Sequence, residues 1–220
     1  MFGGNMGLAG RNIAIITSEM YEDMEVWHPY TRLIEEGANV AIVSMIDSPV
    51  EVLSLHGYPL RTDMDALEAN TGEFSAAIIP GGMAPQMLRR SEAVLDLVRN
   101  LFFQGRVVAA IDQGILVLAS AGDLLSGRAV TAIPPLAHEV ERQSRDPLGI
   151  RWIDQDVVTD GNLITARGIA AVPNFTSEVI RAVQMTPMPT MMPGAPARAP
   201  ATMGEAIPLG TPWLFPPRGL

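Results

Sequence analysis

The sequence has 220 residues, of which 48% are hydrophobic and 18% are charged, a balance that suits one globular domain with a sizeable core. A formal net charge of −9 and a sequence pI near 4.8 argue against a nucleic-acid partner, because affinity for a phosphate backbone comes from clustered Lys and Arg. The chain has no Cys, which excludes disulfides, thiolate metal sites and every thiol-based mechanism.

The N-terminal stretch MFGGNMGLAGRN lacks the charged region and apolar run of a signal peptide. No apolar stretch in the sequence is long enough to cross a bilayer as a helix. We therefore expect a cytoplasmic protein with no membrane partner.

Short apolar runs alternate with helical patterns along most of the chain. The predicted strands are 12–18, 39–45, 74–80, 106–111, 128–132 and 162–168, and the predicted helices are 25–37, 91–105, 115–122, 137–144 and 177–185. The strands lack clean alternation of polar and apolar residues, which is typical of a parallel sheet covered by helices on both faces. Asp160-Gly161 predicts a hairpin turn late in the domain. The pattern favours a doubly wound α/β sandwich.

The character of the sequence changes near residue 185. The segment 185–220 is rich in Pro and Met and almost uncharged, which predicts an extended, polyproline-like arm. It carries Trp213, Leu214 and Phe215, which water disfavours unless they dock on a surface. A mobile tail, docking on the chain's own core or a sister subunit, and docking on another protein all stay open. We divide the chain into a leader (1–11), a domain (12–184) and this arm.

Four features follow strand ends and could meet at one edge of a parallel sheet. They are Glu22, the Gly81-Gly82 pair, Asp112 and Arg167. A Gly-Gly turn can expose backbone N–H groups to an oxyanion. Each feature also has an ordinary structural explanation: a solvated helix start, a chain turn or a surface charge.

The three histidines, His28, His56 and His138, show no spacing typical of a metal site. His28 is expected on a helix face, His56 in a loop or at a strand edge, and His138 toward solvent. We therefore predict no metal ligand set and no cofactor.

Six segments resemble, in order and spacing, the PfpI/ThiJ family of the class I glutamine-amidotransferase-like superfamily. They are YEDMEVWHPYTRLIEEGANVAIVS, LHGYPLRTD, AAIIPGGMAPQMLR, VVAAIDQGILVLASAGDLLSGRAVTA, IRWIDQDVVTDGNLITARG and the helix after it. The resemblance covers roughly residues 12–184. It implies a flavodoxin-like three-layer sandwich, a homo-oligomer, and a site built from an acid, a strained nucleophile turn and a glycine oxyanion loop. Members of that family include cysteine peptidases, glyoxalase- or deglycase-type enzymes, hydratases, chaperones and sensors.

The sequence departs from the family pattern at the residues that carry the chemistry. By that pattern the nucleophilic Cys falls on Asp112, the following His on Gln113, and an acid contributed by a neighbouring subunit on Gln86. The resemblance retains the acid facing the turn, assigned to Glu22, and the Gly81-Gly82 loop. A carboxylate replaces a thiolate poorly in acyl transfer, so the peptidase, glyoxalase and deglycase mechanisms are not expected here.

Two functions from different classes remain open. The first hypothesis is a non-catalytic assembly or binding module whose arm supplies the contact. The second is a thiol-free hydrolase, hydratase or isomerase acting on a small carbonyl or polar substrate. In it Asp112 and Glu22 share a proton, because two carboxylates about 4 Å apart repel by roughly 4 kcal/mol at an effective dielectric of 20. The expected oxyanion- or substrate-binding residues are Gly81, Gly82, Gln113, Gly114, Ile115 and Arg167.

We predict a homodimer or larger assembly by light scattering at micromolar concentration. Deleting residues 188–220 should change that mass, or abolish capture of a partner, while the domain still folds. The reason is that burying several hundred Å² of apolar surface contributes several kcal/mol at about 25 cal/mol per Å². A clean monomer would contradict the expected assembly. If the truncated protein keeps the same mass, partner capture and melting temperature, the expectation for the arm is wrong.

Overall fold

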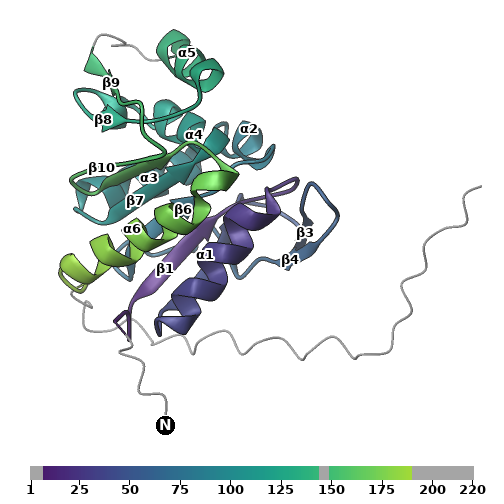
Figure 1. Ribbon diagram of the computed structural model, residues 1–220. Coiled ribbons are helices and arrows are strands. Elements are labelled where there is room, and N and C mark those ends of the chain that lie inside the picture. Colours follow the sequence, from purple (N-terminus) through teal and green to yellow (C-terminus); the bar gives the residue numbers. More distant parts are fainter. Residues whose placement is uncertain (1–6, 144–148, 190–220) are drawn as a thin grey trace, which may run out of the picture.

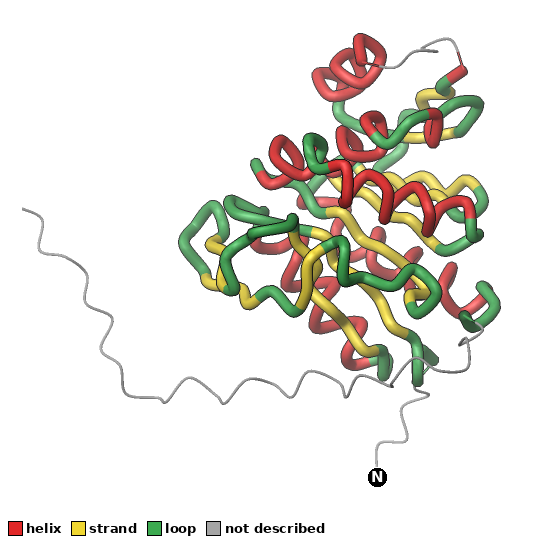
Figure 2. The backbone as a smooth tube through the Cα atoms, turned by 180° about the vertical axis from the view of Figure 1, so that it is seen from behind, coloured by secondary structure: helices red, strands yellow, loops and turns green. Residues whose placement is uncertain are grey.

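A computed structural model describes residues 7–143 and 149–189. It shows a twisted, mostly parallel sheet with helices over both faces (Figures 1 and 2). The flavodoxin-like α/β fold predicted from the sequence is confirmed. Trp213, Leu214 and Phe215, with most of the predicted arm, lie outside the described residues, as does the last residue of the helix predicted at 137–144.

The central sheet has seven strands in the order β10-β11-β7-β6-β1-β2-β5. Their bounds are β1 (Asn12–Ile16), β2 (Asn39–Ser44), β5 (Met64–Asp65), β6 (Phe74–Ile79), β7 (Val107–Ile111), β10 (Val157–Asp160) and β11 (Leu163–Ala166). All neighbouring pairs are parallel except β10 with β11, which pair antiparallel across the turn at Asp160-Gly161. The hairpin predicted at that turn is confirmed.

Helices cover the two faces of the sheet. Their bounds are α1 (Asp23–Glu35), α2 (Ala84–Leu88), α3 (Glu92–Phe103), α4 (Ile115–Ser120), α5 (Pro134–Gln143) and α6 (Val172–Met185). Helices α1 and α6 pack together over one face, and α3 and α4 pack together over the other (Figure 1). Every residue of the central strands β6 and β7 is buried, which is why these strands read as continuous apolar runs in the sequence.

Several elements were not predicted from the sequence. The hairpin of β3 (Glu51–Leu53) and β4 (Pro59–Arg61), the two-residue strand β5 and the short helix α2 fall in stretches without a long apolar period. The strand predicted at 128–132 is shorter than expected and does not belong to the main sheet. It reduces to β8 (Ala129–Val130), which pairs with β9 (Arg151–Trp152) in a separate two-stranded sheet.

The fold brings the carboxyl ends of the parallel strands to one edge, where the chain turns after β1, β6, β7 and β11. The four predicted features that follow strand ends lie in those turns: Glu22, Gly81-Gly82, Asp112 and Arg167. Among residues 7–143 and 149–189, the helices are all too short or too polar to traverse a bilayer.

Gly114 keeps the turn after β7 close to the end of β6. A Cβ at this position would lie 2.2 Å from the Ile79 carbonyl oxygen, a distance that only a backbone shift could relieve. We expect Gly114→Ala to lower the free energy of unfolding by about 3 kcal/mol, the upper end of the range typical of overpacking that moves backbone. Chemical denaturation measures this.

Gly127→Ala is the control, because Gly127 has open space around it. Its φ is +69° and no heavy atom lies within 4 Å of an added Cβ, so only the left-handed conformation costs stability, by about 1–2 kcal/mol. Equal losses in the two variants would show that the contact with Ile79 is not tight.

Candidate functional site

The turn after β7 places a carboxylate on strained backbone. Asp112 begins the 3-10 turn Asp112–Gly114 with φ +50°, in the left-handed region that few residues other than Gly occupy. Asp tolerates this region better than most residues because its short side chain bonds locally. Its side chain is half-buried. The tight turn leading into a helix, predicted from the sequence, is confirmed.

The Gly81-Gly82 loop after β6 lies directly against this turn. A Cβ on Gly81 would lie 2.6 Å from Asp112 Oδ2 and 2.8 Å from Glu25 Oε2. The two carboxyl oxygens therefore converge on the same point beside the loop. Gly82 has φ +77°, and a Cβ there would lie 2.6 Å from the Met20 carbonyl oxygen. Neither glycine can carry a side chain without moving its neighbours.

The N–H groups expected to hold an oxyanion are engaged within the chain. Gly81 N–H donates to Glu25 Oε2 at 2.7 Å, in a buried hydrogen bond. The N–H groups of Gly82 and Gln113 face the Asp112 carboxyl and oppose the rise of its pKa. The N–H of Ile115 turns back to the carbonyls of Asp112 and Gln113. The chain's own carboxyls thus lie against three of these four N–H groups, and the fourth is directed back into the turn.

Glu25 is the buried acid of the site. Burial raises its pKa from 4.5 to about 8, the N–H of Gly81 opposes that rise, and the charges of Asp112 and Glu22 add to it. Burial also raises the pKa of Asp112, while the N–H groups of Gln113 and Gly82 oppose the shift. At neutral pH Glu25 therefore holds a proton beside Asp112.

Glu22 was predicted to be the acid that faces the turn, but the side chain that lies there is Glu25. The missed signal is the period of the helix. Glu25, Pro29 and Leu33 are spaced four residues apart and are all buried, so they share the face of α1 that packs on the sheet. Of the three acids in YEDMEV, only Glu25 lies on that face.

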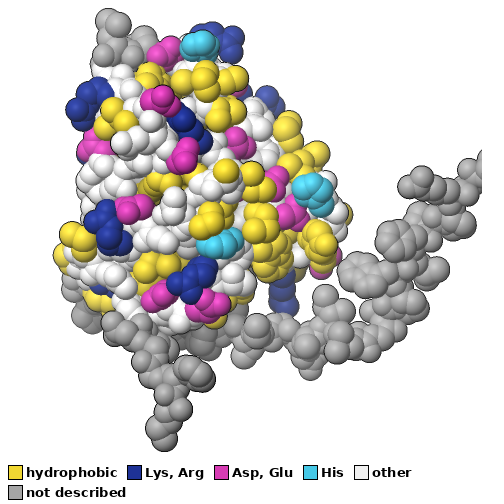
Figure 3. Space-filling model, in the orientation of Figure 1, with side chains coloured by type: hydrophobic (Ala, Val, Ile, Leu, Met, Phe, Trp, Pro, Cys, Tyr) yellow, Lys and Arg dark blue, Asp and Glu magenta, His cyan; other side chains and the backbone are white. Residues whose placement is uncertain are grey.

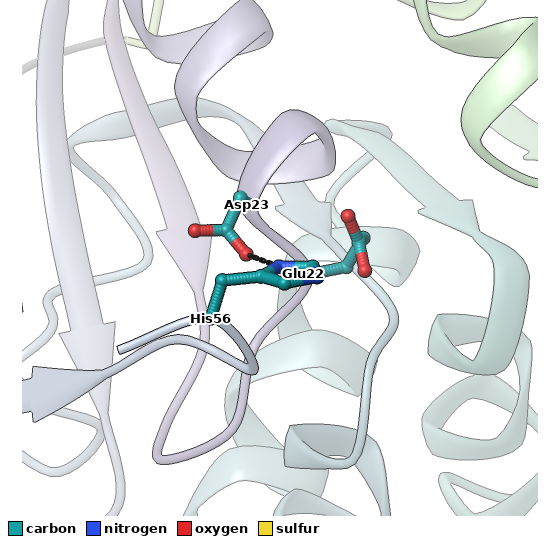
Figure 4. A group of neighbouring side chains, drawn as sticks. All are labelled: Glu22, Asp23 and His56. Atoms are coloured by element: carbon teal, nitrogen blue, oxygen red, sulfur yellow. Dashed lines mark hydrogen bonds and ion pairs between the residues drawn. The ribbon is translucent and has the colours of Figure 1, made fainter. Parts of the chain in front are cut away.

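Glu22 instead lies with two groups at the rim of the site, Asp23 and His56 (Figure 4). His56 Nδ1 is 2.6 Å from Asp23 Oδ2. This contact raises the pKa of the exposed His56. Burial by itself raises the pKa of Asp23, but hydrogen bonds with Ser54 and His56 bring it below its ordinary value. Glu22 makes no side-chain capping bond at the start of α1.

Glu22, Asp23 and His56 are the residues of the described chain that could hold a metal ion, since one ligand atom of each lies within 4.8 Å of the others. No spacing along the chain indicates such a set, because His56 comes from the loop between β3 and β4 and meets the acids only in the fold. Carboxylate and imidazole ligands suit Zn²⁺ and related ions. The Asp23–His56 contact also satisfies both side chains without a metal.

One other predicted site residue has different neighbours from those expected. Arg167 was expected in the site, but its guanidinium pairs with Asp154 and donates to Thr131 Oγ1 at 3.2 Å. The end of β11 approaches the site through Gly168, where a Cβ would lie 3.9 Å from Asp112 Oδ1.

Gln86 and Gln113 form one hydrogen bond, in which Gln86 Nε2 donates to Gln113 Oε1 at 3.0 Å. The resemblance suggested that position 86 would act across a subunit boundary. Here the contact is within one chain. Both amides are neutral at every accessible pH, so this pair cannot move a proton as a His and an acid could.

Comparisons with known proteins agree with this fold. The family model described as DJ-1/PfpI family matches residues 11–182. The chain is 36% identical over 155 residues to Deglycase PfpI of Pyrococcus furiosus and 35% identical over 155 residues to Deglycase PH1704 of Pyrococcus horikoshii, in each case covering 70% of this chain and 89% of the relative. A ThiJ/PfpI domain protein from Brachyspira murdochii superposes with a TM-score of 0.73 at 18% identity, over 82% of this chain and 99% of that one.

A two-domain protein from Anabaena variabilis, containing DJ-1/ThiJ/PfpI-like and ferritin-like domains, superposes with a TM-score of 0.70 at 29% identity. The match covers 78% of this chain and 49% of that protein, so the chain spans about half of it.

The raised pKa of Glu25 predicts a pH-dependent stability. A carboxyl whose folded pKa is about 8 and whose ordinary pKa is 4.5 binds its proton more tightly in the folded state, so the stability it contributes is present below pH 4.5 and lost as the pH rises toward 8. We expect Glu25→Gln, which keeps an acceptor for Gly81 N–H, to gain stability relative to wild type as the pH rises through this window, by at most about 1.4 kcal/mol per pH unit. Urea unfolding across the window measures the difference.

Glu35→Gln is the matched control, because Glu35 lies on the exposed side of the same helix. The stability of this variant should change with pH in the same way as that of wild type. A Glu25→Gln curve that also runs parallel to wild type would contradict the assignment of a protonated, buried Glu25.

Proposed function

The chain belongs to the DJ-1/PfpI family, and from that premise we propose that it is a non-catalytic member of the family, acting as a binding or assembly module. One observation carries the proposal. Of the N–H groups that could stabilise a substrate oxyanion, that of Gly81 donates to Glu25, and those of Gly82 and Gln113 face the carboxyl of Asp112. A substrate oxygen would have to displace a tethered carboxylate to reach them.

The chemistry of the relatives does not transfer. Several relatives are named deglycases. The family resemblance places the nucleophilic Cys at position 112, where this chain has Asp, and the whole sequence contains no Cys. An Asp carboxylate is a much weaker nucleophile than a thiolate toward a carbonyl carbon, and Gln113 cannot accept a proton near neutral pH. We therefore propose no deglycase activity of the usual kind for this chain.

The contact through which the module works is proposed to be the Pro- and Met-rich segment 185–220, on a sister subunit or another protein. Its composition supports this, because Trp213, Leu214 and Phe215 are apolar and close together in a segment with few charges. A homo-oligomer is proposed on the family resemblance.

One observation favours a second function. Glu25 carries a proton at neutral pH beside Asp112, and such a pair can exchange a proton with a substrate. A thiol-free hydrolase, hydratase or isomerase would use Asp112 as the base and Glu25, rather than Glu22, as the acid. It would act on a small carbonyl or polar compound. In this case Asp112 must leave its N–H donors during the reaction.

Removing the carboxylate of Asp112 distinguishes the two functions. Asp112→Gly suits the φ of +50° and frees the N–H groups of Gly82 and Gln113. We expect this variant to bind acetate saturably, with the amide resonances of Gly82 and Gln113 shifting in ¹⁵N spectra, whereas wild type shows no saturable shift. Wild type should also release free amino acid from glycated amino acids no faster than the uncatalysed reaction does.

The matched control is Asp47→Gly. Asp47 is another Asp with positive φ, at +60°, and it is exposed in the loop after β2, so its replacement removes the same charge and strain away from the site. It should bind no acetate. Acetate binding by wild type, or turnover by wild type that Asp112→Asn abolishes, would overturn the non-catalytic proposal, and the latter would favour the acid-base enzyme.

A further inference from the structure

The sequence lacks both of the side chains that react most readily with small electrophiles. It contains no Cys and no Lys, since all 15 of its Lys and Arg residues are Arg. A guanidinium stays protonated in a protein and is a poor nucleophile. The side chains left to react with a small electrophile are therefore chiefly carboxylates, Met thioethers and the three histidines. Among the carboxylates, that of Asp112 has a setting that favours such a reaction.

A carboxylate and a protonated carboxyl converge in the Asp112 turn. Asp112 Oδ2 and Glu25 Oε2 lie 2.6 Å and 2.8 Å from the point that a Cβ on Gly81 would occupy. Because two charged carboxylates this close repel each other, the pair keeps one proton, and Glu25, which is only 2% exposed, holds it. Asp112 is half-buried, so part of it is open to solvent. The charged member of the pair is thus the one that a molecule in solution can reach.

The backbone fixes the Asp112 carboxylate at the end of β7. Asp112 has φ +50° at the start of the 3-10 turn, and the N–H groups of Gly82 and Gln113 face its carboxyl. A nucleophile that is already held in place loses little conformational freedom when it forms a bond. These N–H groups lower the nucleophilicity of the carboxylate, but they also accommodate the carbonyl oxygen of an ester formed on it.

The side of Asp112 toward β11 is open and weakly polar. Gly168 brings no side chain there, and even an added Cβ would lie 3.9 Å from Asp112 Oδ1, an ordinary contact distance. Ile169, the next residue, is 55% exposed and apolar. A small uncharged electrophile suits this approach better than an anion, which the Asp112 carboxylate repels. An epoxide meets this condition, and its ring oxygen needs a proton donor when the ring opens.

We propose that Asp112 is a site of covalent modification by small terminal epoxides, with Glu25 as the proton donor. One Asp112 oxygen attacks the CH₂ carbon of the epoxide, and the ring bond between that carbon and oxygen breaks. The electron pair of the broken bond goes to the ring oxygen, which takes the proton of Glu25. The products are a hydroxyalkyl ester of Asp112 and a Glu25 carboxylate, so every atom of the epoxide is retained. The negative charge moves to Glu25, where Gly81 N–H already donates to Oε2 at 2.7 Å.

The reaction ends at the ester. Hydrolysis would need a base that activates water, and Gln86 and Gln113, which bond to each other, cannot accept a proton. Glu25 is buried and bonded to Gly81 N–H, which keeps bulk water away from it. The inference goes beyond the proposed function and is compatible with it, because a protein that reacts once is consumed and not regenerated. The activity that it assigns is stoichiometric capture of an alkylating electrophile.

Labelling of the full chain with propylene oxide at neutral pH, followed by intact mass measurement and peptide mapping, tests the proposal. We expect wild type to gain the mass of one epoxide on Asp112, at least about tenfold faster than any exposed carboxylate of the same chain is labelled. The exposed carboxylates are the internal reference. Glu35, Asp96 and Glu178 each pair with an Arg on the same helix, and side chains of both charges are interspersed over the surface (Figure 3). These carboxylates face cations, and not a protonated acid.

Three variants identify the groups that react. Asp112→Asn should abolish the label, and Glu25→Gln should slow it by at least about tenfold, because an amide is a far weaker acid than a carboxyl. Glu35→Gln, on the exposed side of the same helix, is the matched control and should react as fast as wild type. Labelling spread evenly over many carboxylates, or confined to His or Met, would overturn the proposal. A Glu25→Gln variant that reacts as fast as Glu35→Gln would overturn the role of Glu25.

The result can be distinguished from that of the proposed function. Absence of a label on Asp112 in wild type would overturn the inference and leave the acetate test on Asp112→Gly unaffected. Diol formed in molar excess over the protein, and lost in Asp112→Asn, would overturn both the end point at the ester and the non-catalytic role.

Discussion

The structure at the carboxyl ends of the parallel strands depends on one contact set, in which the turn Gly81-Gly82 packs against the side chains of Glu25 and Asp112. Gly81 and Gly82 present consecutive N–H groups, and these meet Glu25 from α1 and Asp112 from the turn after β7. The arrangement needs the absence of side chains at both glycines and the positive φ of Gly82 and Asp112. The loop after β1, the start of α1 and the end of β7 are all positioned by this one contact set.

Two acids can share such a small space because one of them is neutral. Burial and the nearby charge of Asp112 keep a proton on Glu25 at neutral pH, so the pair carries at most one negative charge, which the neighbouring backbone N–H groups stabilise. The neighbouring side chains also add no charge to the site. Gln86 and Gln113, which stand where the family pattern expects titratable groups, bond to each other and add no charge. The hydrogen bonds of Gly81 with Glu25 and of Gln86 with Gln113 both lie within the chain.

The sequence contained enough to predict the fold but only part of the site. The buried strands, the turn at Asp112 and the hairpin at Asp160-Gly161 could be predicted because each has a local signal: an apolar run, a strand followed by a helix, a turn dipeptide. The hairpin β3–β4 has no such signal, since its short strands lie outside the core sheet. His56 and the acids of α1 meet only through that hairpin, so no spacing along the chain could reveal the group.

The two errors in the site have physical causes. Glu22 was chosen because it directly follows the first strand in the family pattern, whereas burial of one helix face selects Glu25, three residues later. Arg167 was placed in the site because it ends a strand, but side chains alternate between faces and Arg167 turns to Asp154. Positions at a strand end predict proximity to the site, and they do not predict which side chain points into it.

Neutron diffraction from a crystal grown near neutral pH tests the central claim most directly, because it locates the exchangeable hydrogens of this network. The account predicts a deuteron on the Glu25 carboxyl, the Gly81 N–D directed at Glu25, and the N–D groups of Gly82 and Gln113 directed at the Asp112 carboxylate with nothing between them. A water or buffer anion held by those N–D groups, with the Asp112 carboxylate turned away, would contradict it.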